Sequence, residues 1–248
     1  RIVDVLVEIV QDRSDSVERR LRKCLALARV GGQTHWDNVR GNRVTKFLQA
    51  VRTAMDVEVP RDPSALPPPH WLFGSVLFRS LLAIYATRDR NTHRASRIGR
   101  RLARVHAAWR FARGRGNVPR VNEFMPKVRF DEIERPRPTG HDSQPEIEEI
   151  LERYYAVKLN SLQFFGPPNF NLPLWAGLES LVLTLPMIRW LARAFHDVPP
   201  AEAVQRAIQL VDDHFGGDPM LGFPHIQAVM RTISQRGEIE KLVAWHGR

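Results

Sequence analysis

Apolar residues recur at intervals of three and four along most of the chain, which is the spacing of one face of an α-helix. Seven segments with this spacing predict helices at about 70–88, 92–113, 145–165, 174–196, 201–215, 224–235 and 238–246. Two earlier helices are predicted on the series Val17-Leu21-Leu25-Ala28 and Val44-Phe47-Leu48-Val51-Met55. Ser14 or Ser16 is placed to cap the first of these. The pattern therefore predicts an all-α fold, an irregular multi-helix bundle of about eight to ten helices.

Two proline-rich segments separate the helices. Residues 60–69 hold five prolines in ten residues, and 118–145 hold five more with little periodicity. Because proline breaks helix interiors and central strands, both segments are predicted to be long connections, the second lying along the surface. We expect a basic helical part at 1–117, the connection 118–145, and an acidic helical part at 146–248 packed on the first as one compact unit.

Two segments are apolar enough to raise the question of a membrane span. Residues 71–86 contain Arg79, and 174–192 contain Glu179 and Arg189, so neither reaches the roughly 18 uninterrupted apolar residues of a spanning helix. We expect both to be buried helices and no transmembrane segment, with a kink at Pro186 in the second. The side chains predicted to be buried in the second helix are Trp175, Leu178, Leu181, Leu185, Ile188 and Leu191.

Charge is distributed unevenly along the chain, whose formal net charge is +10. Residues 1–130 carry 26 Lys and Arg against 11 Asp and Glu, whereas 131–248 carry 11 against 16. The cations are mostly arginine, whose planar guanidinium suits carboxylate and phosphate partners. The single cysteine, Cys24, allows no intrachain disulfide and no thiolate-based structural metal site within this chain. We therefore expect a reducing, cytoplasmic compartment.

The helix predicted at 92–113 combines a buried stripe with an arginine-covered face. On a helical wheel, the apolar residues that share one direction are Ile98, Leu102, Val105, Trp109 and Ala112. The candidate anion-binding residues of this helix are Arg97, Arg100, Arg101, Arg104 and Arg110. One interpretation is a surface for an anionic partner, which is nucleic acid, a membrane surface or an acidic protein segment. Nucleic acid is not favoured, because no nucleic-acid-binding motif is present. The alternative is a solvated face that pairs with the acidic second half of the chain.

No motif identifies a catalytic centre or a metal site. The sequence lacks GxSxG, P-loop, HExxH and Gly-rich dinucleotide patterns. Asp212, Asp213 and His214 are consecutive, so on a helix they point in different directions and do not form a ligand set. We therefore assign no metal ligand, no cofactor and no catalytic residue within this chain.

The segment GPPNFNLP at 166–173 joins two strongly apolar helices and is the best candidate for a pocket. Its asparagines are suited to hydrogen bond the carbonyls that its prolines leave without helical donors. If the flanking helices pack antiparallel, Lys158 and Glu179 could approach each other, as a structural tie or as the polar end of a pocket. The pocket candidates are Tyr155, Lys158, Asn169, Glu179, Asp213 and His214.

The sequence at 150–215 includes ILERYYAVKLNSLQFFGPPNFNLPLWAGLESLVLTLPMIRWLARAF and VDDHFGGDPMLG. These segments, with the earlier VRGNRVTKFLQAV, PPPHWLFGSVLFRSLLAIYATRD and AAWRFARGRGNVPR, resemble the C-terminal helical region of bacterial cysteine-cluster proteins. These are zinc- or iron-chelating domain proteins related to flagellin lysine N-methylase. The family's cysteine cluster is absent from this chain. The resemblance therefore implies that any metal or iron–sulfur centre, and any methyltransferase-like chemistry, lies in a region upstream of Arg1 or in another protein.

Two functions of different classes follow from the sequence. The first is a helical companion region of a cysteine-cluster metal-binding protein, which supplies a partner surface for chemistry done elsewhere. The second is a stand-alone helical module that binds an anionic partner, an acidic protein or nucleic acid, through the arginine-rich helix.

Overall fold

Helices make up most of the described chain. A computed structural model describes residues 1–34, 36, 41–86, 97–119, 126–135 and 144–247, and the side chains of all of these except 97–104. The described residues form eleven α-helices and no β-sheet, which confirms the all-α prediction. They are α1 (Ile2–Val10), α2 (Val17–Gln33), α3 (Asn42–Glu58), α4 (Leu77–Ala86), α5 (Arg97–Arg113), α6 (Phe130–Glu134), α7 (Pro145–Asn160), α8 (Leu174–Ala194), α9 (Pro200–His214), α10 (Pro224–Gln235) and α11 (Glu238–His246). The total exceeds the expected eight to ten because α1 and α6 were not predicted.

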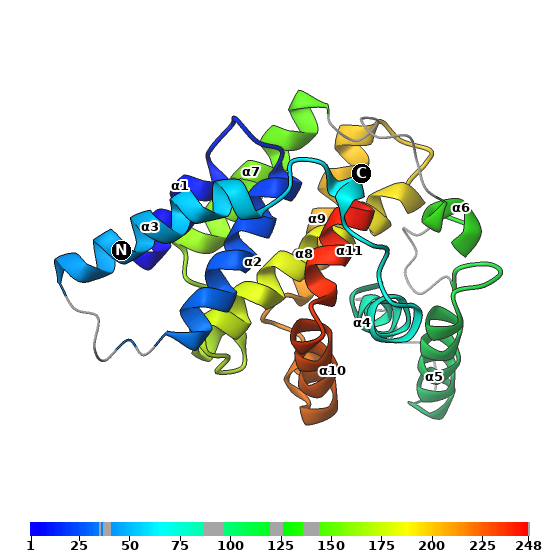
Figure 1. The fold of residues 1–248 in the computed structure, drawn as a ribbon. Coiled ribbons are helices and arrows are strands. Elements are labelled where there is room, and N and C mark those ends of the chain that lie inside the picture. The colour runs from blue at the N-terminus through cyan, green and yellow to red at the C-terminus, as the bar shows by residue number, and fades with distance from the viewer. Residues whose placement is uncertain (35, 37–40, 87–96, 120–125, 136–143, 248) are drawn as a thin grey trace.

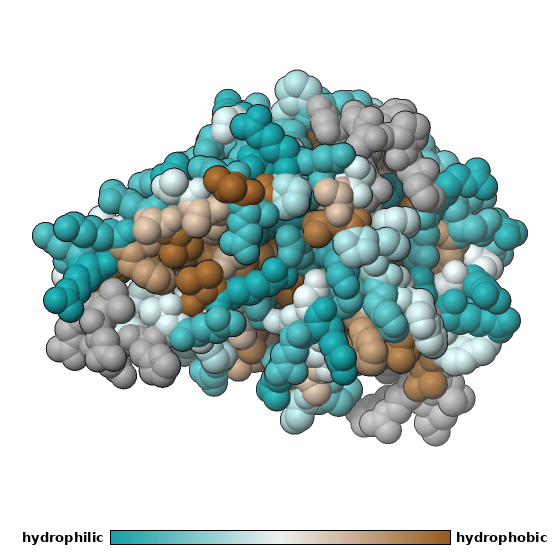
Figure 2. All heavy atoms as spheres, in the orientation of Figure 1, coloured by the Kyte–Doolittle hydropathy of each residue, from teal (hydrophilic) through white to brown (hydrophobic). Residues whose placement is uncertain are grey.

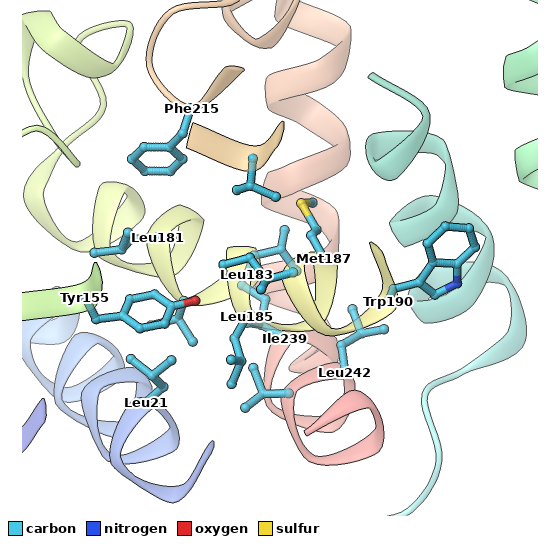
Figure 3. Close-up of a cluster of buried hydrophobic side chains, with 14 of the residues drawn as sticks. Leu21, Tyr155, Leu181, Leu183, Leu185, Met187, Trp190, Phe215, Ile239 and Leu242 are labelled. Atoms are coloured by element: carbon cyan, nitrogen blue, oxygen red, sulfur yellow. The ribbon is translucent and has the colours of Figure 1, made fainter. Parts of the chain in front are cut away.

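The central element of the fold is α8, which lies between α2, α9 and α11 (Figure 1). Its sequence is mostly apolar and most of its residues are buried, as expected of a helix that other helices surround. Buried side chains of α2, α7, α9 and α11 meet it in one continuous core, from Leu21 and Tyr155 to Phe215 and Leu242 (Figure 3). The helix continues through Pro186, which lies inside it.

Two glycines let other elements approach α8 closely. A Cβ at Gly177 would lie 2.1 Å from the carbonyl oxygen of Phe164, so the first turn of α8 rests directly on the preceding loop. A Cβ at Gly31 of α2 would overlap the ring of Trp175, which stacks on Trp36 with a centroid distance of 5.8 Å. Glycine is needed at both positions because any side chain would separate the packed elements.

The buried stripe predicted for α8 is largely confirmed. Leu178, Leu181, Leu185, Ile188 and Leu191 are all buried. Trp175 is a partial exception because it is only half-buried, one face lying against α2.

The expectation that 118–145 follows the surface does not hold at every described residue, because part of this connection is buried. Val118 and Val128 are buried and pair through a backbone hydrogen bond of 2.8 Å. The short helix α6 then buries Phe130 and Ile133, and the ring of Phe130 contacts Phe111 and Trp190. Three aromatic rings from α5, α6 and α8 therefore join this connection to the core.

Among the described residues, α8 alone is long and apolar enough to cross a membrane. Within its most apolar 18 residues, 78% are buried inside the protein. A helix at the centre of a helical core has the same length and composition, so these two properties do not indicate a span.

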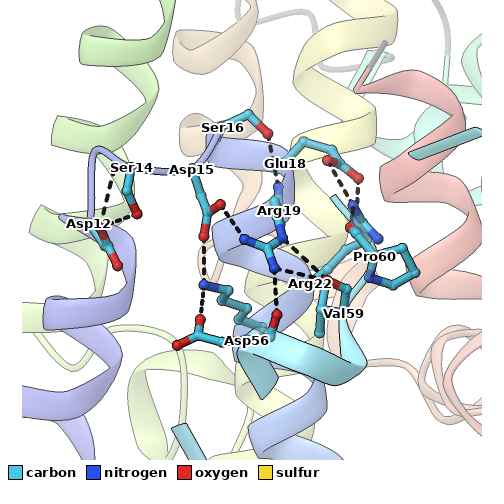
Figure 4. A network of polar contacts seen from close by, with 11 residues as sticks. Asp12, Ser14, Asp15, Ser16, Glu18, Arg19, Arg22, Asp56, Val59 and Pro60 are labelled. Carbon is cyan, nitrogen blue, oxygen red and sulfur yellow. Dashed lines mark hydrogen bonds and ion pairs between the residues drawn. The ribbon is translucent and has the colours of Figure 1, made fainter. Parts of the chain in front are cut away.

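The first half of α2 buries four cations and a glutamate. Glu18, Arg19, Arg20, Arg22 and Lys23 are all at most 5% exposed, and Ser16 caps the helix through the backbone N–H of Arg19. These charges are neutralised within the chain, and Figure 4 shows the contacts of Arg19 and Arg22. Such neutralisation is required because an unpaired charge in the interior is strongly destabilising.

Partners from three other segments surround these cations. Arg19 and Lys23 both contact Asp15, and Lys23 also contacts Asp56 of α3. The guanidinium of Arg22 contacts Glu18 and donates to the carbonyl oxygen of Pro60 at 2.8 Å. The buried charges of α2 thus hold α3 and the start of the first proline-rich segment in place.

On another side of α2, Arg20 reaches α1 and α7. Its guanidinium donates to the carbonyl oxygen of Val10 at 2.5 Å and lies 2.9 Å from a carboxylate oxygen of Glu152. Glu148 also contacts Arg20, and it accepts the backbone N–H of Val17 at 2.6 Å. Part of the acidic second half therefore neutralises the arginines of α2.

We expect Leu178→Ala to lower the free energy of unfolding by about 2–5 kcal/mol, because Leu178 is fully buried and its truncation leaves a cavity in the core. Chemical denaturation followed by circular dichroism measures this loss. Val57→Ala is the matched control, since Val57 is almost fully exposed and should change stability by less than about 0.5 kcal/mol. Equal losses for the two variants would contradict the described core.

Asp15→Asn should destabilise the protein by on the order of 3 kcal/mol at pH 7, because it leaves Arg19 and Lys23 without their shared carboxylate. Burial raises the pKa of Asp15, but hydrogen bonds from Lys23 and Arg19 outweigh it and hold the pKa below its ordinary value. The ionised carboxylate therefore stabilises the fold above the unfolded pKa of about 4, and this stability is lost as the pH falls through the folded pKa.

Denaturation curves between neutral and acid pH check this linkage. Asp15→Asn should show a shallower loss of stability toward acid than the natural sequence. Glu149→Gln is the control, because it removes the same charge from an exposed pair with Arg153 and should matter little. An unchanged acid limb in Asp15→Asn would overturn the assignment.

Candidate functional site

The loop 166–173 lies between the end of α7 and the start of α8, and Pro168 contacts Gly216, which follows α9. Gly166, Phe170 and Asn171 adopt positive φ, and Gly166 pairs with Leu172 across the turn. The side chain of Asn169 is buried and donates to the carbonyl oxygen of Phe164 at 2.8 Å, as its sequence position suggested. Asn169 therefore satisfies the backbone of the loop.

The ammonium group of Lys158 lies at the end of α7 and is held by α9. Its Nζ is 2.5 Å from a carboxylate oxygen of Asp212 and 3.2 Å from the side-chain oxygen of Gln163. The ring centroids of Tyr154 and Phe215 lie about 6 Å away, at 6.0 and 5.7 Å. Lys158 is buried while Asp212 is half-exposed, so this pair ties two helices together at the edge of the core.

Tyr155 and His214 are both buried. The hydroxyl of Tyr155 lies 2.9 Å from that of Thr184 on α8, and burial raises the pKa of Tyr155 above its ordinary value. The Nδ1 of His214 lies 2.9 Å from a carboxylate oxygen of Asp218, and its ring contacts Tyr85. Both side chains are thus held by local partners within the core.

The structure does not bring Lys158 and Glu179 together as a pair. Glu179 hydrogen bonds Ser234 and lines a separate cavity of about 180 Å³ between α8 and α10. Burial raises the pKa of Glu179, while Ser234 and the charge of Arg29 act in the opposite direction. In the described part of the chain, Lys158 is paired with Asp212, which sequence reasoning treated only as part of a possible ligand set.

Asp212, Asp213 and His214 diverge as expected of consecutive helical residues. Asp212 reaches Lys158, His214 reaches Asp218, and Asp213 is exposed. Within the residues that the structure describes, no group of three or more His, Cys, Asp or Glu side chains could hold a metal ion. Burial raises the pKa of Cys24 to about 12, so its thiol is protonated at neutral pH.

The predicted buried stripe of α5 is wrong at Val105 and Trp109, while the side chains of Ile98 and Leu102 lie outside the described residues. Val105 is 68% and Trp109 56% exposed, whereas Ala107 and Phe111 are buried. Phe111 packs on Phe130 and Trp190, and this contact fixes which of the two apolar faces of the helix turns inward. The surface of α5 therefore carries an apolar strip at i and i+4.

Two described arginines flank this strip. The guanidinium of Arg113 lies 5.4 Å from the centroid of the Trp109 ring, and Arg110 donates to the carbonyl oxygen of Asn117 at 2.7 Å. Neither arginine pairs with a carboxylate among the described residues. The side chains of the other candidates, Arg97, Arg100, Arg101 and Arg104, lie outside the described residues.

The acidic second half instead pairs with other cations of the first half. Glu148 and Glu152 contact Arg20, Glu134 contacts Arg79, and Glu240 contacts Arg29. These ion pairs place the negative charge of α7 and α11 beside α2 and that of α6 beside α4. None of these ion pairs involves Arg110 or Arg113 of α5.

Comparison with protein-family models, with curated proteins and with solved structures found no match to this chain. The resemblance to cysteine-cluster proteins therefore stays a prediction from the sequence.

We expect Asp212→Asn to destabilise the protein more than Lys158→Met. The asparagine leaves a buried ammonium group without its counter-ion, at a loss of about 2 kcal/mol, whereas methionine fills the same space without a charge. Urea denaturation of both single variants and the double variant measures the two losses and their coupling. A larger loss for Lys158→Met would contradict a purely structural role for the pair.

Proposed function

We propose that this chain is a helical binding region whose exposed α5 face recognises an acidic, amphipathic segment of a partner protein. Binding of a partner is common to both functions that the sequence suggested. The observation that supports the proposal is the outward position of Val105 and Trp109 beside Arg110 and Arg113.

The apolar part of this face suits a partner helix. Val105 and Trp109 are one turn apart on α5, so a partner can contact both from one side. Tryptophan and arginine are enriched among residues that dominate binding energy at protein interfaces. α5 lies at the periphery of the molecule against α4, and apolar surface is visible where these helices meet (Figures 1 and 2).

The charge of the face selects the chemistry of the partner. No acidic residue occurs between Asp89 and Glu123, so α5 itself contains arginines and no carboxylate. A positive helix face attracts acidic segments and repels basic ones. Nucleic acid is the less favoured partner, because its phosphates match the charge but leave the aliphatic surface of Val105 without a complement.

A synthetic acidic peptide tests this proposal. The probe is a fluorescent peptide of about 20 residues, long enough to form a helix, with leucines along one face and glutamates elsewhere. We expect saturable binding that weakens about tenfold in Trp109→Ala and also in the double variant Arg110→Gln, Arg113→Gln. Fluorescence anisotropy measures the affinity, and thermal melting verifies that each variant is folded.

Matched controls separate a specific surface from general attraction. Trp71→Ala removes another exposed tryptophan, 69% exposed at the start of the helix before α4, and should leave the affinity unchanged. A peptide with lysine in place of glutamate should not bind. Equal weakening by Trp109→Ala and Trp71→Ala, or tighter binding of a single-stranded oligonucleotide, would overturn the proposal.

A further inference from the structure

A second positively charged feature is a cavity of about 180 Å³ where α8 ends and α9 begins. Its walls come from Ile147 of α7, the last turns of α8, residues 195–198 and the first turn of α9. The apolar part includes Ala192, Phe195, Val198 and Val204. The volume is slightly larger than that of a cavity known to admit benzene, roughly 150 Å³. The space thus accommodates a ligand the size of a small aromatic acid.

Two buried guanidinium groups line this cavity. Arg189 is 3% and Arg193 7% exposed, and His196 lies at the more exposed rim. None of the described residues that line the cavity is an aspartate or a glutamate. The lining therefore combines three groups that can donate to an anion with an apolar wall.

Both arginines are positioned by the protein. Arg189 lies 3.5 Å from a carboxylate oxygen of Glu148, and Arg193 donates to the carbonyl oxygen of His246 at 3.0 Å. A guanidinium carries five N–H donors, so it can keep such contacts and still bind a planar anion. Fixed donors in a site of low dielectric attract an anion more strongly than mobile surface arginines do.

The electrostatic environment of this end of α8 is positive. Burial, together with the charges of Arg193 and Arg79, lowers the pKa of His246 well below its ordinary value. Glu148 is shared between Arg189 and Arg20, and Arg20 also pairs with Glu152. The first turn of α9 lines the cavity as well, and the N-terminal end of a helix dipole adds to the positive potential.

We propose that this cavity binds a small organic anion, a carboxylate or a phosphate monoester, whose apolar body lies against Phe195 and Val198. The anionic group would lie against Arg189 and Arg193. This site is separate from the α5 face, and the proposal does not depend on the one made for that face.

Three compounds of similar size test the proposal on the full chain. Benzoate carries a carboxylate, phenyl phosphate a phosphate monoester, and benzamide is the neutral counterpart of benzoate. Isothermal titration should show saturable binding of benzoate, of phenyl phosphate or of both, and at least tenfold weaker binding of benzamide. The tighter of the two anions identifies the anionic group that the site prefers. Equal binding of benzamide, or no saturation by either anion up to about 10 mM, would overturn the proposal.

Variants then locate the binding. Arg193→Gln should weaken anion binding at least tenfold, and Ala192→Leu should do the same because the larger side chain fills the cavity. Arg206→Gln is the matched control, since it removes an arginine from an exposed pair with Glu202 on α9, outside the cavity lining. Trp109→Ala should also leave the affinity unchanged.

If Arg193→Gln proves unfolded by circular dichroism, Ala192→Leu and the comparison of benzoate with benzamide still decide the question. Undiminished anion binding in a folded Ala192→Leu variant would place the ligand elsewhere and contradict the proposal.

Discussion

The need to neutralise the buried cations of α2 governs how the helices are arranged around it. Four cations are buried within two turns of this helix: Arg19, Arg20, Arg22 and Lys23. Each would strongly destabilise the fold if it had no partner. The partners come from the α1–α2 turn, α1, α3, the segment after α3, and α7. Geometry that satisfies all of these contacts at once leaves little freedom in the placement of α1, α3 and α7. Specific ion pairs thus fix the positions of the helices around α2, as apolar packing fixes those of the helices around α8.

The sequence predicted the apolar framework well because periodicity records which residues must leave water. The series from Val17 to Ala28 on α2, and the predicted leucines of α8, are buried as their spacing required. Periodicity could not show that the arginines between them are buried too. Their carboxylates lie far away in sequence, as in the pairing of Arg20 with Glu152. In the sequence alone, several neighbouring charged residues look like the solvent-exposed face of a helix.

The orientation of α5 shows the same limit in another form. This helix has apolar residues on two sides, one through Val105 and Trp109 and the other through Ala107 and Phe111. Which side turns inward depends on Phe130 and Trp190, and no local pattern contains that information. The pocket candidates failed to converge for a related reason. From the sequence alone, either Asp212 or Glu179 could pair with Lys158, depending on how the helices pack. Because α7 packs on α9, Lys158 pairs with Asp212.

The two proposed binding sites, the α5 face and the cavity beside α8, differ in how their arginines are exposed to solvent. The described arginines of α5 lie at the surface, where ions screen a charge within about 8 Å at physiological ionic strength. Those of the cavity beside α8 are buried and held by protein contacts. Attraction to the α5 face is therefore sensitive to salt and suited to reversible association with a flexible partner. Attraction in the cavity is less sensitive to salt, and its size and apolar wall allow it to select a ligand by shape as well as charge.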